Sequence, residues 1–289
     1  MSGDEDRVRV WRVDDRKKVA TMTAKLVQCL AVSSDGMWIA AGTTWSGFIV
    51  RSTKTYEKVL TLEEGTVITG LDFSPDSTRL VTASDNRTAA VWDITTRDRL
   101  LLLRHKDDVI AAKYAPQGDR IATATRHSVR FYDSNEGHLL AEAQVKVTSR
   151  CHSCLLWSDK YLFVVSNNKI KQIDPSNGSV VSKWPVPHSN SSSCIALPQH
   201  GQYIACSTDR TVTLWDTSTR IQLGSIEYPQ DVRSIALSPD ARTLATGDEN
   251  GVISSKRLSL LRVSRNGSSQ IMAYLKKYFT SSSGTNHSY

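Results

Sequence analysis

Residues 203–216 read Tyr-Ile-Ala-Cys-Ser-Thr-Asp-Arg-Thr-Val-Thr-Leu-Trp-Asp, and the same stretch recurs in eroded form along most of the 289-residue chain. Its first part, Tyr203 to Ser207, is rich in residues that favour a β-strand. The polar residues after it predict a turn, and a β-branched run from Thr211 then leads to Trp215. The segment therefore predicts a β-hairpin whose second strand ends on a large aromatic residue.

The aromatic position of this hairpin recurs at a nearly constant interval. With Trp215 as the marker, equivalent positions are 11, 51, 92, 132, 173, 215 and 255, which lie 40 to 42 residues apart. A turn signal such as Ser74-Pro75-Asp76 precedes each marker from the second copy onward by 16 to 18 residues. Two signals in fixed phase indicate an array of similar units, each of which buries its apolar face against its neighbours.

These motifs resemble the repeats of the WD40 family, and the resemblance covers roughly residues 6 to 253. It implies an all-β propeller built from four-stranded blades. The chain begins with strands in the third and fourth positions of a unit, continues through five complete units, and ends on a first and second strand. We therefore expect a WD40 β-propeller of six blades, closed by a composite N-/C-terminal blade. The alternative is an incomplete seven-bladed ring that stays open.

The charge of the chain is concentrated at its C-terminal end. The net charge is +7, yet residues 256–289 contain six basic and no acidic residues, which leaves 30 basic against 29 acidic residues elsewhere. We expect a propeller over residues 1–255 and a basic, Ser-rich, disordered tail over residues 256–289. A nearly neutral body argues against a nucleic-acid partner.

Several classes of function lack their sequence signals. No apolar run approaches the roughly 18 residues of a membrane span, and the acidic N-terminus does not resemble a signal peptide. Cys151 and Cys154 have the spacing of half a zinc site, but no second ligand pair follows. No phosphate-binding Gly-rich loop is present. We expect an intracellular protein, cytoplasmic or nuclear, without a cofactor, metal or membrane partner.

The resemblance also implies a buried structural network in which a His, a Ser or Thr, an Asp and the strand Trp share hydrogen bonds. The residues that match it are His188, Ser207, Asp209 and Trp215 in the fifth complete unit, together with Trp92 and Asp93 in the second. A catalytic Ser-His-Asp interpretation is disfavoured because Ser207 lies inside a predicted strand, whereas a nucleophile needs an exposed position beside oxyanion donors.

In the family's geometry, the turns between second and third strands and the blade entrances form one rim, which usually binds partners. The residues on it are Trp45, Arg87, Arg126, His127, Arg150, Arg210 and Arg233. Trp and Arg are frequent anchors of interfaces, and Arg suits an acidic or phosphorylated segment.

We therefore predict a non-catalytic scaffold that binds a protein or peptide partner over the rim. The alternatives are a nucleic-acid-associated propeller and an enzyme with a site in the central channel, although the sequence contains no cluster of titratable residues that indicates such a site.

Overall fold

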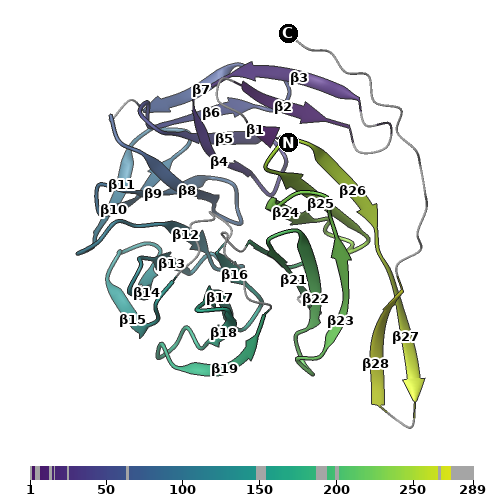
Figure 1. Ribbon diagram of the computed structural model, residues 1–289. Helices are drawn as coiled ribbons and strands as arrows, with labels where there is room; N and C mark the ends of the chain where they lie inside the picture. The colour runs from purple at the N-terminus through teal and green to yellow at the C-terminus, as the bar shows by residue number, and fades with distance from the viewer. Residues whose placement is uncertain are drawn as a thin grey trace.

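A computed structural model describes residues 2–3, 7–12, 15, 17–24, 26–62, 65–147, 154–186, 194–198, 202–265 and 268–274. All regular elements in these ranges are β-strands. They form antiparallel sheets arranged around a central axis, with the first strand of each complete unit innermost (Figure 1). The predicted all-β propeller is confirmed.

Five complete blades succeed one another around the ring. The first contains β4 (Val27–Val32), β5 (Trp38–Thr43), β6 (Phe48–Ser52) and β7 (Lys58–Leu62). The second contains β8 (Ile68–Phe73), β9 (Arg79–Ser84), β10 (Thr88–Asp93) and β11 (Arg99–Arg104). The third contains β12 (Ala111–Tyr114), β13 (Arg120–Ala124), β14 (Ser128–Asp133) and β15 (Leu139–Gln144). The fourth contains β16 (Leu155–Trp157), β17 (Leu162–Ser166), β18 (Lys169–Ile173) and β19 (Val180–Pro185). The fifth contains β20 (Ile195–Ala196), β21 (Tyr203–Thr208), β22 (Thr211–Asp216) and β23 (Gln222–Glu227).

The sixth blade and the N-terminal sheet each have three strands. The sixth blade contains β24 (Val232–Leu237), β25 (Thr243–Asp248) and β26 (Ile253–Arg257). The N-terminal sheet contains β1 (Ser2–Gly3), β2 (Arg7–Trp11) and β3 (Lys18–Thr23). β26 pairs with β25 and β1 pairs with β2, and the strand pairing of the described residues does not join the two sheets. Closure by a composite blade is therefore not confirmed.

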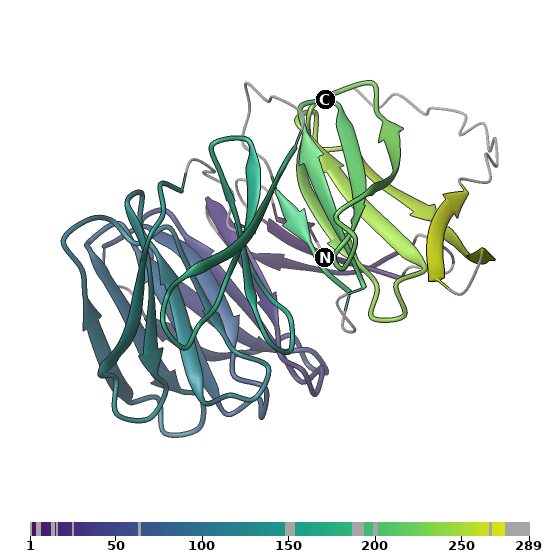
Figure 2. The ribbon, with the colours of Figure 1, turned by 90° about the horizontal axis from the view of Figure 1, so that it is seen from below.

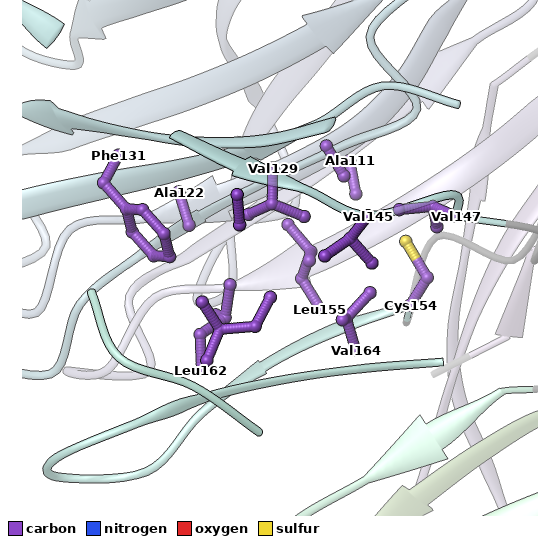
Figure 3. Packing of buried hydrophobic residues seen from close by; sticks show 13 residues of the cluster. Ala111, Ala122, Val129, Phe131, Val145, Val147, Cys154, Leu155, Leu162 and Val164 are labelled. Carbon is purple, nitrogen blue, oxygen red and sulfur yellow. The ribbon is translucent and has the colours of Figure 1, made fainter. Parts of the chain in front are cut away.

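The core consists of separate clusters, each between two consecutive sheets. The cluster between the third and fourth blades, for example, joins Ala122, Val129 and Phe131 to Leu155 and Leu162 (Figure 3). Corresponding clusters lie between every other consecutive pair, beginning with the N-terminal sheet and the first blade. Among the described residues, no such cluster joins the sixth blade to the N-terminal sheet. In the part of the chain that the structure describes, the clusters that join consecutive blades therefore do not continue from the sixth blade to the N-terminal sheet.

Side-chain hydrogen bonds shape the turns that the sequence signals predict. In the second blade, Ser74 Oγ donates to Asp76 Oδ1 (2.5 Å) and accepts from Arg79 N (2.9 Å) between the first and second strands. At the end of the third strand, Asp93 Oδ1 accepts from Thr95 N and Thr96 N, both at 2.8 Å. The same capped turn comes after Asp133, Asp174 and Asp216. A carboxylate at this position therefore helps the chain to reverse into a fourth strand.

The third strand of the sixth blade differs from the sequence alignment by one residue. Its pairing places Lys256 opposite Leu244, as Trp215 lies opposite Ile204, so the aromatic position is 256 and not 255. The preceding turn has three residues, Glu249 to Gly251, where the fifth blade has two, and this explains the shift.

The predicted division of the chain at residue 255 stays a prediction. β26 continues to Arg257, and Leu258 is buried in the cluster between the fifth and sixth blades. Where the sequence predicts a disordered tail, β27 (Ser259–Arg265) pairs with β28 (Ser268–Tyr274). This hairpin lies at the periphery, with β28 against β23 (Figures 1 and 2).

Candidate functional site

One end of the ring combines the turns between second and third strands with the blade entrances. Backbone hydrogen bonds of about the usual length tie each turn to an entrance segment. They run from Thr44 N to Leu26 O (3.1 Å), His105 N to Arg87 O (2.9 Å), Val147 N to Arg126 O (3.0 Å) and Tyr228 N to Arg210 O (2.8 Å). We call this end of the ring the rim. The residues singled out in these turns therefore share one end of the propeller.

Trp45 is the most exposed large hydrophobic residue of the rim. It lies between β5 and β6, where Thr43 N donates to Gly47 O (2.9 Å) and Ser46 N donates to Thr43 Oγ1 (3.0 Å). This tight turn leaves 67% of Trp45 exposed. An indole held outward on an ordered turn can insert into a partner at little further conformational cost.

Leu26 is a rim residue that sequence reasoning missed. It is 40% exposed, and the bond from Thr44 N to its carbonyl places it beside the turn that carries Trp45. Its backbone φ of 49° lies in the left-handed region, which is unfavourable for leucine. The available signal was a large apolar residue directly before a predicted strand, at a blade entrance.

Arg87, Arg126 and His127 lie in the corresponding turns of the second and third blades, and all three are exposed. Arg87 is preceded by Asn86, whose Oδ1 accepts from Thr88 N (3.1 Å) across the turn. Thr125 Oγ1 likewise accepts from His127 N (3.3 Å) and Ser128 N (3.1 Å). Short, side-chain-capped turns thus hold Arg87, Arg126 and His127 at successive positions around the rim.

The remaining predicted rim residues differ in their surroundings. Arg210 is exposed in the turn of the fifth blade, next to Asp209. Arg233 lies in β24, where Nη2 is 3.1 Å from Glu249 Oε2 and 3.7 Å from Asp231 Oδ2. These carboxylates offset much of its charge, so Arg233 is a weaker anion ligand than an isolated arginine would be. Arg150 lies outside the described residues.

The third blade contains a partly buried polar group around His105. A carbonyl can only accept, so Nδ1 donates to Leu103 O (3.2 Å) and Nε2 accepts from the Thr123 hydroxyl (2.9 Å), with Tyr132 Oη 3.3 Å away. Burial, assisted by the positive charge of Arg130, lowers the pKa of His105 to about 4. The histidine is therefore neutral near pH 7 and has a structural role between strands.

The residues proposed for the fifth-blade network have other partners in the described part of the chain. Trp215 Nε1 donates to Thr213 Oγ1 (2.9 Å), whereas Ser207 Oγ accepts from Cys194 N (3.1 Å). Asp209 has a φ of 48° within the turn. His188 lies outside the described residues, so the complete network stays a prediction.

In the second blade, Trp92 and Asp93 act at separate places. Trp92 Nε1 donates to Thr82 Oγ1 across the sheet (3.1 Å), so the indole nitrogen is satisfied although the side chain is buried. Asp93 instead caps the turn that leads to the fourth strand. Thr82 can accept this bond because it lies on β9, the strand next to that of Trp92. The repeat period alone does not predict this partner.

The described residues contain no group of three or more His, Cys, Asp or Glu side chains that could hold a metal ion. Cys154 is buried, which raises its thiol pKa to about 12, and Cys151 lies outside the described residues. Within the same ranges, no helix is long and apolar enough to cross a membrane.

Comparison with known proteins extends these observations. The family model described as "WD domain, G-beta repeat" matches residues 16–50, 56–93, 179–216 and 222–254. The serine-threonine kinase receptor-associated protein of Gallus gallus is 27% identical over 187 residues, which cover 63% of this chain and 52% of the relative. The U3 small nucleolar RNA-associated protein 15 homolog of Xenopus laevis is 26% identical over 196 residues, covering 64% of this chain and 37% of the relative.

A third relative, the WD repeat-containing protein 18 of Danio rerio, is 22% identical over 284 residues, covering 87% of this chain and 65% of the relative. The chain thus spans between 37% and 65% of the length of these relatives. The similarity to this third relative covers most of the repeats of the chain.

Proposed function

The chain belongs to the WD40-repeat β-propeller family, and from this premise we propose that it is a non-catalytic scaffold that binds a protein or peptide partner over the rim. The observation that carries the proposal is Trp45, which is 67% exposed at the end of the ring where the turns of successive blades also present arginines. Exposed tryptophan and arginine are the side chains that most often supply the energy of an interface.

An acidic or phosphorylated segment is the partner chemistry that best suits this rim. Arg87 and Arg126 are exposed, and a guanidinium can make paired hydrogen bonds with a carboxylate or phosphate. Leu26 and Trp45 add an apolar contact at the neighbouring blade. We therefore propose that a partner places an apolar side chain against the first blade and an acidic or phosphorylated residue near the second or third.

The relatives support an intracellular role in association with other macromolecules. One is named for association with a serine-threonine kinase receptor and another for association with U3 small nucleolar RNA. We propose an intracellular location, cytoplasmic or nuclear, and a protein or peptide as the direct partner.

The test is affinity capture with the full chain and two matched triple variants. The rim variant carries Trp45→Ala, Arg126→Glu and Arg210→Glu. The control carries Met37→Ala, Lys54→Glu and Arg220→Glu, which lie in turns at the opposite end of the sheets. Both variants change one apolar and two basic residues, so the net charge changes by the same amount.

We expect the rim variant to recover specific partners roughly tenfold less than the wild type, while the control recovers them normally. Phosphatase treatment of the lysate then separates a phosphorylated partner from an acidic one, and nuclease treatment is expected to leave recovery unchanged. Equal recovery by the rim variant and the wild type would show that the rim is not the binding surface.

A further inference from the structure

The outer edge of β26 is the second surface whose arrangement suggests a ligand. Leu258 N donates to Arg242 O (2.7 Å) and Asp248 N donates to Val252 O (3.1 Å), which fixes the residues of β26 that bond to β25. Because bonded pairs alternate along an antiparallel ladder, Ser254 and Lys256 also face β25. The main-chain groups of residues 253, 255 and 257 therefore point toward the outer edge, which carries no paired strand in the described part of the chain.

The five complete blades all cover this edge with a fourth strand. In the fifth blade, the equivalent residues Val212 and Leu214 pair with Ile226 and Gly224 of β23. The chain reaches that fourth strand through a turn capped by Asp216. In the sixth blade Arg257 takes the place of this aspartate, and it lacks the short acceptor that caps the turn.

Among the six blades, the residue at the start of the third strand is exposed only in the sixth. Ile253 is 46% exposed, whereas each equivalent residue in the complete blades is 0% exposed. Those residues are Phe48, Ala89, Val129, Ile170 and Val212. In the fifth blade, Ile226 of the fourth strand lies directly opposite Val212, and both belong to one core cluster. Val232 and Ile235 of the next blade belong to the same cluster. An apolar residue opposite Ile253 would therefore supply one of the two contacts that bury Val212.

Positive charge beside the outer edge of β26 favours an added strand that carries negative charge. Lys256 and Arg257 lie on β26, and Arg242, directly before β25, accepts from Leu258 N. Asp240 is the nearby acid, and the hydrogen bond from Ser238, with smaller contributions from Arg242 and Arg257, lowers its pKa. The third blade shows how such a cation is paired, because Arg130 Nε of its third strand is 2.8 Å from Glu142 Oε1 of its fourth. A fourth strand carrying an acidic residue fits this environment.

We propose that the outer edge of β26 binds an extended acidic segment of a partner protein, which adds to the sixth blade as an antiparallel fourth strand. Residues opposite 257, 255 and 253 lie on one face of the added strand at intervals of two. The recognised segment therefore carries Asp or Glu opposite Arg257 and, four positions later, a β-branched apolar residue opposite Ile253. Main-chain bonds to residues 253, 255 and 257 supply sequence-independent affinity.

The N-terminal sheet is the internal competitor for this edge. Its apolar residues Val8 and Met22 pack against the first blade, so they are not available to cover Ile253. Its outer strand β3 begins with the exposed Lys18, which would add a like charge near Lys256 and Arg257. An acidic strand from another protein therefore complements the charge of this edge better than β3 would.

The experiment measures the fluorescence anisotropy of a short labelled peptide of the form Thr-Glu-Val-Thr-Val-Val-Thr, titrated with the full chain. Its control peptide has Lys in place of Glu. The key variant is Ser255→Pro, which removes an outward N–H without removing a bond to β25. Its matched control is Ser255→Ala, which keeps the N–H. A charge-reversal variant, Arg257→Glu, tests the predicted ion pair independently of the backbone.

We expect saturable binding of the acidic peptide that falls roughly tenfold for the Lys peptide, for Ser255→Pro and for Arg257→Glu, but not for Ser255→Ala. Arg257→Glu should bind the Lys peptide better than the acidic one. The rim variant should bind the acidic peptide as the wild type does, which separates this site from the proposed rim function.

Three results would overturn the proposal. The first is an absence of saturable binding, as expected if an N-terminal strand already covers the edge. The second is equal affinity for the acidic and Lys peptides. The third is a dimer of the free chain, seen by light scattering, that Ser255→Pro converts to a monomer, because the edge would then pair with a second copy. Unfolding curves show whether Ser255→Pro retains the fold, and Arg257→Glu decides the question if it does not.

Discussion

The fifth and sixth blades have the same first three strands but differ in the path of the chain beyond the third. β22 ends on Trp215-Asp216, and the chain reverses into β23; β26 ends on Lys256-Arg257, and the chain continues into β27. The residue at the start of the third strand is buried in the fifth blade, where Ile226 of the fourth strand and Val232 of the next blade share its cluster, and is half-exposed in the sixth. The comparison indicates that the reversal into a fourth strand is favoured by a short side-chain acceptor after the third strand, such as Asp216 or Ser52, which Arg257 does not supply.

The largest expected difference in stability is between two isoleucines at equivalent positions of two blades. Ile170 and Ile253 occupy equivalent sites in the fourth and sixth blades, with 0% and 46% exposure. We expect Ile170→Ala to lower the free energy of unfolding by about 2–5 kcal/mol because it leaves a cavity. Ile253→Ala should cost less than about 1 kcal/mol. Urea denaturation of both variants measures the difference, and equal losses would mean that the sixth blade is as fully covered as the fourth.

The pH dependence of stability tests the partly buried polar group around His105 in a complete blade. The folded pKa of His105 is lowered from 6.5 to about 4, so its contribution is complete above the unfolded pKa. As pH falls from 6.5 toward 4, the unfolded chain takes up the proton first and stability is lost, by at most about 3 kcal/mol. Thermal unfolding between about pH 7 and pH 4.5 should show this slope reduced in His105→Gln.

The exposed His127→Gln is the control for that experiment, because its side chain lies on the rim and not between strands. We expect it to keep the wild-type slope. A wild-type slope in His105→Gln as well would show that His105 is not buried in its neutral form.

The indole bond of the fifth blade gives a smaller effect. Thr213→Val leaves the buried Nε1 of Trp215 without its partner, which should cost about 1–3 kcal/mol. The equivalent residue in the sixth blade is Ser254, which has no tryptophan to satisfy, so Ser254→Ala should cost less than about 0.5 kcal/mol. Chemical denaturation distinguishes the two, and a comparable loss in Ser254→Ala would argue against the assigned difference between the blades.

The smallest expected effect concerns the capped turn. Asp216→Ala removes an acceptor of the backbone N–H groups of Ser218 and Thr219, at a cost of about 1–2 kcal/mol. Arg257→Ala, at the equivalent position, should change stability by less than about 0.5 kcal/mol. Differential scanning calorimetry can resolve the pair; similar shifts in melting temperature would mean that the aspartate is dispensable for the reversal.

The repeat could be predicted from the sequence because strand periodicity and turn chemistry are local. Ser74-Pro75-Asp76 and Trp92-Asp93 each mark a turn whose hydrogen bonds involve residues two to five positions away. The aromatic position of the sixth blade was displaced by one because its turn has an additional residue, and a fixed repeat length does not detect that.

The partners of individual side chains and the closure of the ring were less predictable. Trp215 bonds to Thr213 of its own strand, although the family pattern assigns it to a network with Ser207 and His188. The charge of Arg233 is offset by Glu249 from the turn between β25 and β26, which the positions of the rim arginines in the sequence do not show. Closure depends on whether two sheets far apart in sequence present complementary faces, and strand patterns alone do not determine this.

The central claim is that a fourth strand covers the third strand in five blades, whereas no strand of the described residues pairs with the outer edge of β26. Amide hydrogen exchange of the free, monomeric chain tests it at Leu214 and Ser255, which hold equivalent outward positions on β22 and β26. The account predicts that the Ser255 amide exchanges roughly a hundredfold faster than the Leu214 amide. Equal protection of the two amides would contradict it, because β26 would then already be paired with a fourth strand.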